Sequence, residues 1–94
     1  MKIFFSSSAK LDLSEIVEYI ADDNPTAARN WFDEVNEAIT KLSSFPALGR
    51  IVPEYSDETI REIIKGQYRI VYRINIDKES LCVIAIHHSK RLLK

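Results

Sequence analysis

The chain has 94 residues, of which 46% are hydrophobic and 29% are charged, and its formal net charge is −1. These values are ordinary for a globular protein and exclude a disordered or fibrous chain, and the length leaves room for a single domain over residues 1–94. No run approaches the roughly 20 apolar residues that a membrane-spanning helix needs, so we expect a soluble, cytoplasmic protein without a membrane contact.

The charge is divided unevenly along the chain. Residues 1–47 hold four basic and eight acidic side chains, a sum of −4, whereas residues 48–94 hold nine basic and six acidic side chains, a sum of +3. An anionic partner would therefore meet the second half. The single cysteine, Cys82, lies in an apolar run and is expected to be a buried thiol. The sequence has no disulfide framework and no zinc spacing, so we expect neither a metal nor a cofactor.

The first half predicts a strand followed by two helices. Lys2–Phe5 is a short apolar strand, and the serines at 6–8 offer N-caps for a helix that must end near Asn24, before Pro25. Asn24 is itself a strong N-cap and Pro25 suits the first helical position, so a second helix begins at once. It ends at Phe45-Pro46. The two helices therefore form a hairpin with a turn of a few residues.

The second half predicts three strands after a long connecting segment, Phe45–Thr59, and segments of this length are often functional. Arg61–Arg73 (REIIKGQYRIVYR) is two strands around a tight turn at Gly66-Gln67, because glycine tolerates the positive φ of such turns. A further turn at Asp77–Ser80 precedes Leu81–His88, an apolar strand expected to be buried on both faces. The expected fold is α+β, in the order β-α-α-β-β-β, with an antiparallel sheet covered on one face by the N-terminal helical hairpin.

The strand after the tight turn has two different faces. Its apolar face carries Ile70, Tyr72, Ile74 and Ile76, and its other face carries Arg69, Val71, Arg73 and Asn75. Such alternation predicts one face on the core and one face free. Guanidinium groups on a free face suit a phosphate or carboxylate partner, although a purely solvated surface carries arginine equally well.

Two further candidates lie outside that strand. Glu54 stands in the long connecting segment, and His88 follows His87 at the end of the last strand. A solvated acid and a packed or exposed histidine are the simpler interpretations. Beside Arg69, however, they would supply the base, the acid and the cation that RNA cleavage through the 2′-hydroxyl needs. Spacing alone does not bring the three together.

Four segments in register resemble the RelE/ParE superfamily of type II toxin–antitoxin toxins. They are DLSEIVEYIADDNPTAARNWFDEV, FPALGRIVPE, REIIKGQYRIVYRI and HHSKRLL, and they extend over almost the whole chain. The resemblance implies a β-α-α-β-β-β toxin that inhibits growth, belongs to a plasmid-stabilisation type of system, and is held inactive by a cognate antitoxin in a hetero-oligomer.

The branches of the superfamily differ in their target. ParE-like members poison DNA gyrase, and the pieces matching that branch are Asn24-Pro25 with Ala27-Ala28, Gly49-Arg50, Val52-Pro53-Glu54, Arg61-Glu62, Tyr68-Arg69 and the spacing of His88 to Arg91. This resemblance implies a binding poison without chemistry of its own. Its contact groups would be Arg50, Arg61, Arg69, Arg73 and Arg91 on a docking surface.

The alternative is a RelE- or YoeB-like endoribonuclease that cleaves mRNA on the ribosome. Arg69 would then match the strand arginine that contacts the scissile phosphate, with Glu54 and His88 as acid or base. Against it, the C-terminal tyrosine and the lysine pair before the hairpin have no counterpart, and the chain is slightly acidic where ribosomal RNA favours basic proteins. The ParE-like interpretation is therefore preferred, and a non-toxic antitoxin-binding relative is a third possibility.

Overall fold

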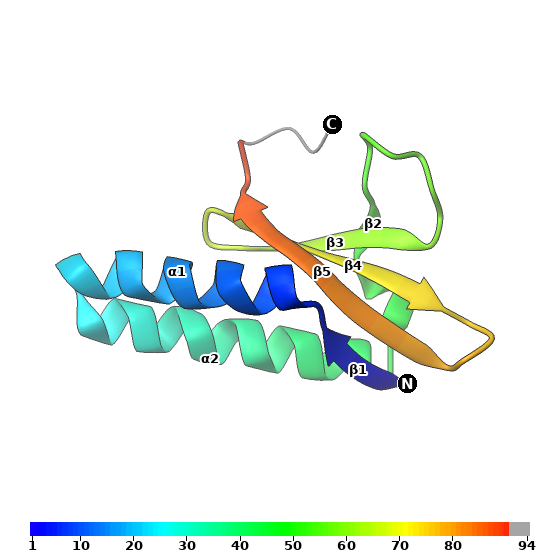
Figure 1. The fold of residues 1–94 in the computed structure, drawn as a ribbon, viewed down its shortest axis with the longest axis horizontal. Helices are drawn as coiled ribbons and strands as arrows, with labels where there is room; N and C mark the ends of the chain where they lie inside the picture. The colour runs from blue at the N-terminus through cyan, green and yellow to red at the C-terminus, as the bar shows by residue number, and fades with distance from the viewer. Residues whose placement is uncertain (91–94) are drawn as a thin grey trace.

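The computed structural model of the protein describes residues 1–90. The elements are β1 (Lys2–Phe5), α1 (Ser7–Asp23), α2 (Pro25–Leu42), the 3-10 turn η1 (Pro46–Leu48), β2 (Arg50–Ile51), β3 (Ile60–Lys65), β4 (Tyr68–Asn75) and β5 (Ser80–His88). Figure 1 shows the two helices side by side, with the twisted sheet beside them. The expected α+β class and element order are confirmed, and the segment expected to be a plain connection also contains η1 and β2.

The sheet has the strand order β1-β5-β4-β3-β2. The pairs from β2 to β5 are antiparallel, but β1 runs parallel to β5, with Ile3 opposite Leu81. The sheet is therefore mixed and not purely antiparallel as expected. Short turns force the later strands to be antiparallel, whereas the helical hairpin after β1 is long enough to permit either direction.

Polar residues cap the start of α1 and the junction between the two helices of the predicted hairpin. Ser6 Oγ accepts a hydrogen bond of 3.0 Å from the Ala9 N–H at the start of α1. Asn24 closes α1 through its own N–H, which donates to Ile20 O at 2.9 Å. Its side-chain oxygen accepts from the Ala27 N–H at 3.0 Å and so caps α2. One extended residue thus ends one helix and starts the next, as the Asn-Pro pair predicted.

The main core lies between the helical hairpin and the face of the sheet that it covers, which we call the inner face. Ile70 and Tyr72 of β4 are fully buried there, as predicted. The other buried members of this core are Ala9, Trp31, Val35, Ile39, Leu42, Leu81, Val83 and Ile86. The predicted turn is also present, and Gly66 adopts a φ of +59°.

A β-bulge interrupts the pairing of β5 with β4. Tyr72 lies opposite Val83, but Val71 lies opposite Ala85, so Ile84 is an extra residue in β5. Side chains from the start of the chain satisfy the irregular backbone here: Ser6 Oγ donates to Ile84 O at 3.1 Å. Asp12 Oδ2 accepts from the Ile86 N–H at 3.0 Å. The bulge is thereby fixed, and it shifts the side-chain alternation of β5 by one residue.

The opposite face of the sheet, the outer face, is not free. Residues 49–59, which we call the strap, cross over β3 and β4, and Val52 of the strap is buried with Ile60 and Val71 in a second small core. The prediction of an open arginine face is therefore wrong at Arg69, which is only 4% exposed. Period-2 alternation shows which residues share a face, but it does not show what covers that face.

Cys82 is half-buried and not fully buried as expected. It lies opposite Arg73 on the outer face of the sheet, and Arg73 is itself exposed. Among residues 1–90, no helix is long and apolar enough to cross a lipid bilayer.

Candidate functional site

A network of four charged side chains lies between the strap and the outer face. Arg69 Nε donates to Glu62 Oε1 at 2.5 Å, and its two terminal nitrogens donate to the two oxygens of Glu54 at 2.7 and 2.8 Å. Arg50 Nε donates to the second oxygen of Glu62 at 2.7 Å. The bidentate bond from Arg69 to Glu54 holds the strap onto β4, and the bond from Arg50 holds the start of the strap onto β3.

Burial makes the loss of any single partner in this network costly. Glu62 is 1% exposed and Arg69 is 4% exposed, so each would be costly without the other. The hydrogen bonds to Glu54, and then those to Glu62, raise the pKa of Arg69 even though burial acts in the opposite direction. Two carboxylates and two guanidiniums balance one another. The network is therefore neutral as a whole and Arg69 stays positively charged.

The strap begins with a tight contact at Gly49. Its N–H donates to Tyr72 Oη at 2.9 Å, and that hydroxyl donates to Pro46 O at 2.6 Å. A Cβ at Gly49 would lie 2.5 Å from Glu62 O and 2.7 Å from Tyr72 Oη, so no larger residue fits without displacing backbone. Burial raises the pKa of the Tyr72 phenol. The close packing therefore explains the glycine at position 49, and the ion pair with Glu62 gives the following Arg50 a structural role.

The predicted arginines are spread over two faces and several environments. Arg50 has 64% of its side chain exposed although it contacts Glu62, and Arg73 is exposed on the outer face. Arg61 is half-buried on the inner face, because it lies opposite Tyr72, and it donates to Gly49 O at 3.0 Å. Arg91 lies outside the described residues. The four of these arginines that the structure describes therefore do not form one surface.

The three predicted catalytic residues are brought together only in part. Glu54 and Arg69 are in direct contact, but His88 is exposed and packs edge-on against Tyr68 at a ring-centroid distance of 5.7 Å. His87, not His88, lies opposite Arg69. The bulge explains this exchange: unbroken alternation from Cys82 would have placed His88 on the face of Arg69.

Sequence reasoning missed Glu62 and His87 as neighbours of Arg69. A signal for Glu62 was available, because period-2 alternation in IREIIK places this carboxylate between Ile60 and Ile64 on one face, where a buried charge needs a partner. No local signal marks His87, since the bulge depends on contacts with Ser6 and Asp12 far away in the sequence. Within residues 1–90, no group of three or more His, Cys, Asp or Glu side chains is arranged to hold a metal ion.

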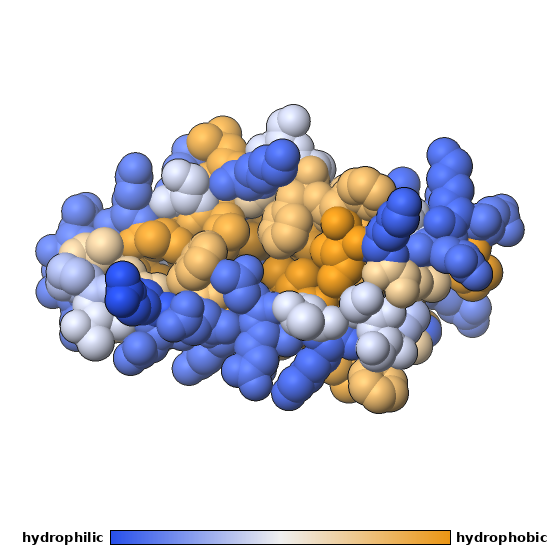
Figure 2. All heavy atoms as spheres, turned by 90° about the horizontal axis from the view of Figure 1, so that it is seen from below, coloured by the Kyte–Doolittle hydropathy of each residue, from blue (hydrophilic) through white to orange (hydrophobic). Residues whose placement is uncertain are grey.

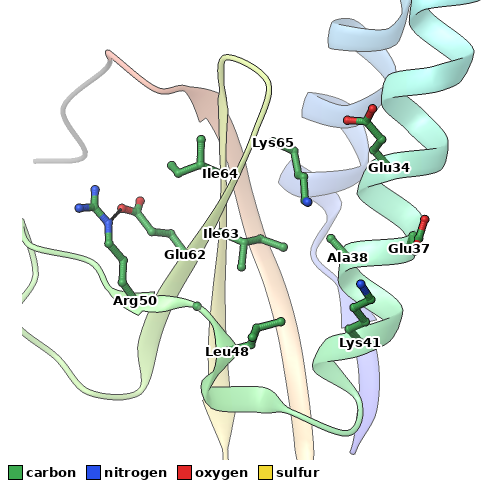
Figure 3. Close-up of a pocket in the computed structure, with 11 residues that line it drawn as sticks. Glu34, Glu37, Ala38, Lys41, Leu48, Arg50, Glu62, Ile63, Ile64 and Lys65 are labelled. Carbon is green, nitrogen blue, oxygen red and sulfur yellow. Dashed lines mark hydrogen bonds and ion pairs between the residues drawn. The ribbon is translucent and has the colours of Figure 1, made fainter.

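Two grooves mark the helical layer. The first, with a volume of about 480 Å³, lies between α2 and β3 (Figure 3). The second, with a volume of about 810 Å³, lies between α1 and α2, and Leu13, Val17, Ala28 and Phe32 contribute its apolar lining. Viewed from below, apolar side chains form a band along the molecule (Figure 2). The helical hairpin therefore leaves apolar surface uncovered in this structure.

Comparison with known proteins identifies the family. Residues 3–93 match the family model described as the ParE toxin of the type II toxin–antitoxin system parDE. The chain belongs to the ParE toxin family. It is also 38% identical over 77 residues to a protein of Sinorhizobium fredii (strain NBRC 101917 / NGR234) named "Putative toxin Y4kP", a match that covers 80% of this chain and 77% of that protein.

Solved structures show the same fold in two toxin–antitoxin systems. A chain of the chromosomal ParDE system from P. aeruginosa aligns with a TM-score of 0.75 and 16% identity over 96% of this ParE-family chain and 97% of that chain. A chain of the RelBE2 complex from Mycobacterium tuberculosis aligns with a TM-score of 0.63 and 20% identity over 93% and 95%. The structures agree with the fold, and the match of residues 3–93 to the ParE toxin model confirms the predicted RelE/ParE superfamily: the protein is a toxin of a type II toxin–antitoxin system.

Proposed function

We propose that this ParE-family toxin inhibits growth by binding and poisoning DNA gyrase, without cleaving a covalent bond itself. The supporting observation is the state of Arg69. An arginine that stabilises a phosphorane must direct its N–H groups at the reacting phosphate. Here the Arg69 guanidinium is buried and donates to Glu54 and Glu62 instead. A target phosphate would have to displace the strap carboxylate first.

The position of His88 also favours a binding poison. A proton-transferring histidine must lie within hydrogen-bond reach of the reacting group. His88 belongs to the residue pair Tyr68–His88, one position along the strands from Arg69–His87, so the two side chains leave opposite faces of the sheet. Under this proposal, His88 packs against Tyr68 and has no catalytic role.

The exposed guanidiniums then serve as contact groups. Arg50 and Arg73 both lie on the outer face and are exposed to solvent. Arg69 contributes indirectly, because it holds the strap that presents Arg50 beside Glu62. Arg61 acts in the same indirect way through Gly49 O.

A cognate antitoxin is the second partner of the proposed function. Support comes from the family match and from the two structural relatives, which belong to a ParDE system and a RelBE2 toxin–antitoxin complex. The apolar groove between α1 and α2 is the kind of surface that a partner covers in a stable complex.

An endoribonuclease is the alternative, and one observation favours it. Glu54, Arg69 and His87 share the outer face, so a base, a cation and an imidazole are within one neighbourhood. Opening of the strap would expose them together. This alternative requires His87, where the sequence pointed to His88.

A supercoiling assay with purified gyrase tests the proposal. We expect wild-type protein at micromolar concentration to inhibit supercoiling, Arg73→Gln to weaken that inhibition, and Lys78→Gln, a matched charge removal on the exposed β4–β5 turn, to leave it unchanged. A translating extract with the same proteins should show no new mRNA cleavage.

The opposite results in the gyrase and cleavage assays would contradict the proposal. If wild-type protein leaves gyrase unaffected but cleaves mRNA, and His87→Gln abolishes that cleavage while His88→Gln does not, the toxin is a nuclease. If expression without an antitoxin leaves growth unchanged, the protein is a non-toxic relative, and the proposal is equally wrong.

A further inference from the structure

The strap is attached to the sheet at separate points along its length. At its start, the Gly49 N–H donates to Tyr72 Oη at 2.9 Å. In its middle, Val52 is buried in the second small core, and Glu54 accepts two hydrogen bonds from Arg69. A segment held in this way opens locally at a lower free energy than the strands of the main core. Opening of the strap would uncover Arg69, which is otherwise 4% exposed.

Two features of the closed strap are unfavourable. Ser56 has a φ of +51°, a left-handed conformation that favours glycine. Arg61 donates to Gly49 O through one terminal nitrogen, but its buried Nε has no hydrogen-bond partner within residues 1–90. A left-handed residue other than glycine costs free energy, and so does a buried donor without an acceptor. Opening of the strap would relax Ser56 and would let water reach Arg61.

The start of the strap also belongs to the groove between α2 and β3. Gly49, Arg50 and Glu62 line this groove, together with Leu48 of η1. Figure 3 shows Leu48 and Arg50 on one continuous segment, with the Arg50 guanidinium bonded to Glu62. The residues that anchor the start of the strap are therefore accessible from the groove.

Gly49 has no free space on its side-chain side. A Cβ at this position would lie 2.5 Å from Glu62 O and 2.7 Å from Tyr72 Oη. Both of these neighbours belong to paired strands, and Tyr72 is fully buried. The sheet therefore resists a displacement at Gly49, and the strap is the part that has to move.

Ion pairs transmit such a movement to the middle of the strap. Arg50 contacts one oxygen of Glu62, and Arg69 contacts the other oxygen. The Glu62 side chain is completely buried, so without Arg50 it depends on Arg69 alone. A shift of Arg69 toward Glu62 moves the guanidinium out of line with the Glu54 carboxylate. Loss of the contact at the start of the strap therefore weakens the contact in its middle.

We propose that the strap opens and closes over Arg69 as one cooperative unit, and that displacement of Gly49 from the groove releases it. A molecule that presses on Gly49 from the groove would then unmask Arg69 on the outer face without touching it. The groove and the outer face are coupled in this way through the strap. The inference concerns the chain by itself and not its target, so it and the gyrase proposal can fail independently.

Amide hydrogen exchange followed by NMR tests whether the strap opens as a unit. The reporters are the amides of Gly49 and Val52, each of which donates a hydrogen bond while the strap is closed. We expect the two amides to share one protection factor, lower by about tenfold or more than that of the amides in β4 and β5. Separate protection factors for the two reporters would overturn the inference. Exchange of both only together with β4 and β5 would overturn it as well.

Gly49→Ala tests release from the groove. The added methyl group would clash with Glu62 O and Tyr72 Oη, so we expect it to accelerate exchange of the Val52 amide by about tenfold, with a smaller change in β4 and β5. An unchanged Val52 amide would contradict the inference. Should Gly49→Ala fail to fold, Tyr72→Phe replaces it, because it removes the acceptor of the Gly49 N–H without adding bulk.

Glu54→Gln tests the coupling in the opposite direction. It removes the charge from the bonds to Arg69, and we expect it to accelerate exchange of the distant Gly49 amide by about tenfold. Glu58→Gln removes an exposed charge from the same strap and is the matched control, with exchange as in the wild type. If Glu54→Gln leaves the Gly49 amide unchanged, the two anchors act separately and the inference is wrong.

Chemical modification of arginine tests the unmasking itself. Phenylglyoxal reacts with accessible guanidinium groups, and mass spectrometry of proteolytic peptides locates the products. We expect Gly49→Ala to accelerate the reaction of Arg69 by about tenfold, the same factor as for the Val52 amide, and to leave the exposed Arg73 unchanged. An unchanged rate at Arg69, in a variant whose Val52 amide exchanges faster, would show that the strap does not mask Arg69 and would contradict the inference.

Discussion

The two faces of the sheet are stabilised in different ways. The inner face lies under two helices and is held by apolar burial, with Ile70 and Tyr72 fully enclosed. The outer face lies under an eleven-residue strap, Gly49–Thr59, and is held by one small apolar cluster and by the ion pairs of Arg69. Because ion pairs need defined partners, one substitution can release the strap, whereas the inner face distributes its stability over many contacts.

Among the substitutions that test this difference between the two faces, the loss of Arg69 should have the largest effect on stability. Arg69→Ala leaves Glu62 buried with only Arg50 as a partner and removes the bidentate hydrogen bonds to Glu54. We therefore expect a loss of about 3–5 kcal/mol in the free energy of unfolding. Urea denaturation measures it.

A double variant serves as the control for that loss. Arg69→Leu combined with Glu62→Leu should be less destabilised than Arg69→Ala alone, because no buried charge is then left unpaired. Additive costs of the two substitutions would contradict the account of the outer face.

Tyr72→Phe tests the point where the two faces meet. The ring stays in the inner core, but the Gly49 N–H and the Pro46 carbonyl lose their partner, so we expect a loss of about 1–3 kcal/mol. Urea denaturation at neutral pH measures this loss.

The same substitution has a signature at high pH. Burial raises the pKa of the phenol, so its stabilisation is complete below the usual tyrosine pKa of about 10 and is lost as pH rises through the higher folded value. Urea denaturation between neutral and alkaline pH should therefore show a steeper loss in the wild type than in Tyr72→Phe. Equal slopes would show that the pKa of the Tyr72 phenol does not change on unfolding, which would contradict this prediction.

The smallest expected effect concerns the end of the strap. The Asp57 carboxylate accepts from the Thr59 hydroxyl at 2.7 Å and from the Thr59 N–H at 2.9 Å, and these bonds, the hydroxyl first, lower its pKa. A lowered folded pKa stabilises the protein above the unfolded value, and this stabilisation disappears as pH falls through the folded value. Asp57→Asn should therefore lose less thermal stability than the wild type between neutral and acidic pH. Glu58→Gln, which removes an exposed carboxylate one residue away, is the matched control.

Local signals predicted the elements, but not what covers them. Asn24-Pro25, Ser6 and Gly66 act on their own backbone or within a few residues, so their roles can be read from the sequence. The partners of Arg69 come from the strap and from β3, and no local pattern shows that these segments meet there. Two identical alternations can therefore describe a solvated face or a covered one.

The histidine pair shows how a single β-bulge changes which side chain lies on the face of Arg69. Counting by twos from Cys82 assigns His88 to the face of Arg69, yet the extra residue Ile84 transfers that place to His87. The assignment depends on Ser6 and Asp12, more than seventy positions away in the sequence, which hold the irregular backbone. A catalytic role assigned by strand parity alone would therefore fall on the wrong residue.

The parallel pairing of β1 with β5 has a consequence for synthesis on the ribosome. Ile3 is synthesised long before its partner Leu81, so β1 has no strand beside it until β5 has emerged from the ribosome. The helical hairpin, by contrast, is made of two consecutive elements and can form early, and its apolar stripe stays exposed until β4 and β5 pack against it. The complete sheet, with the strap and the arginines on its outer face, can therefore form only after β5 has been synthesised.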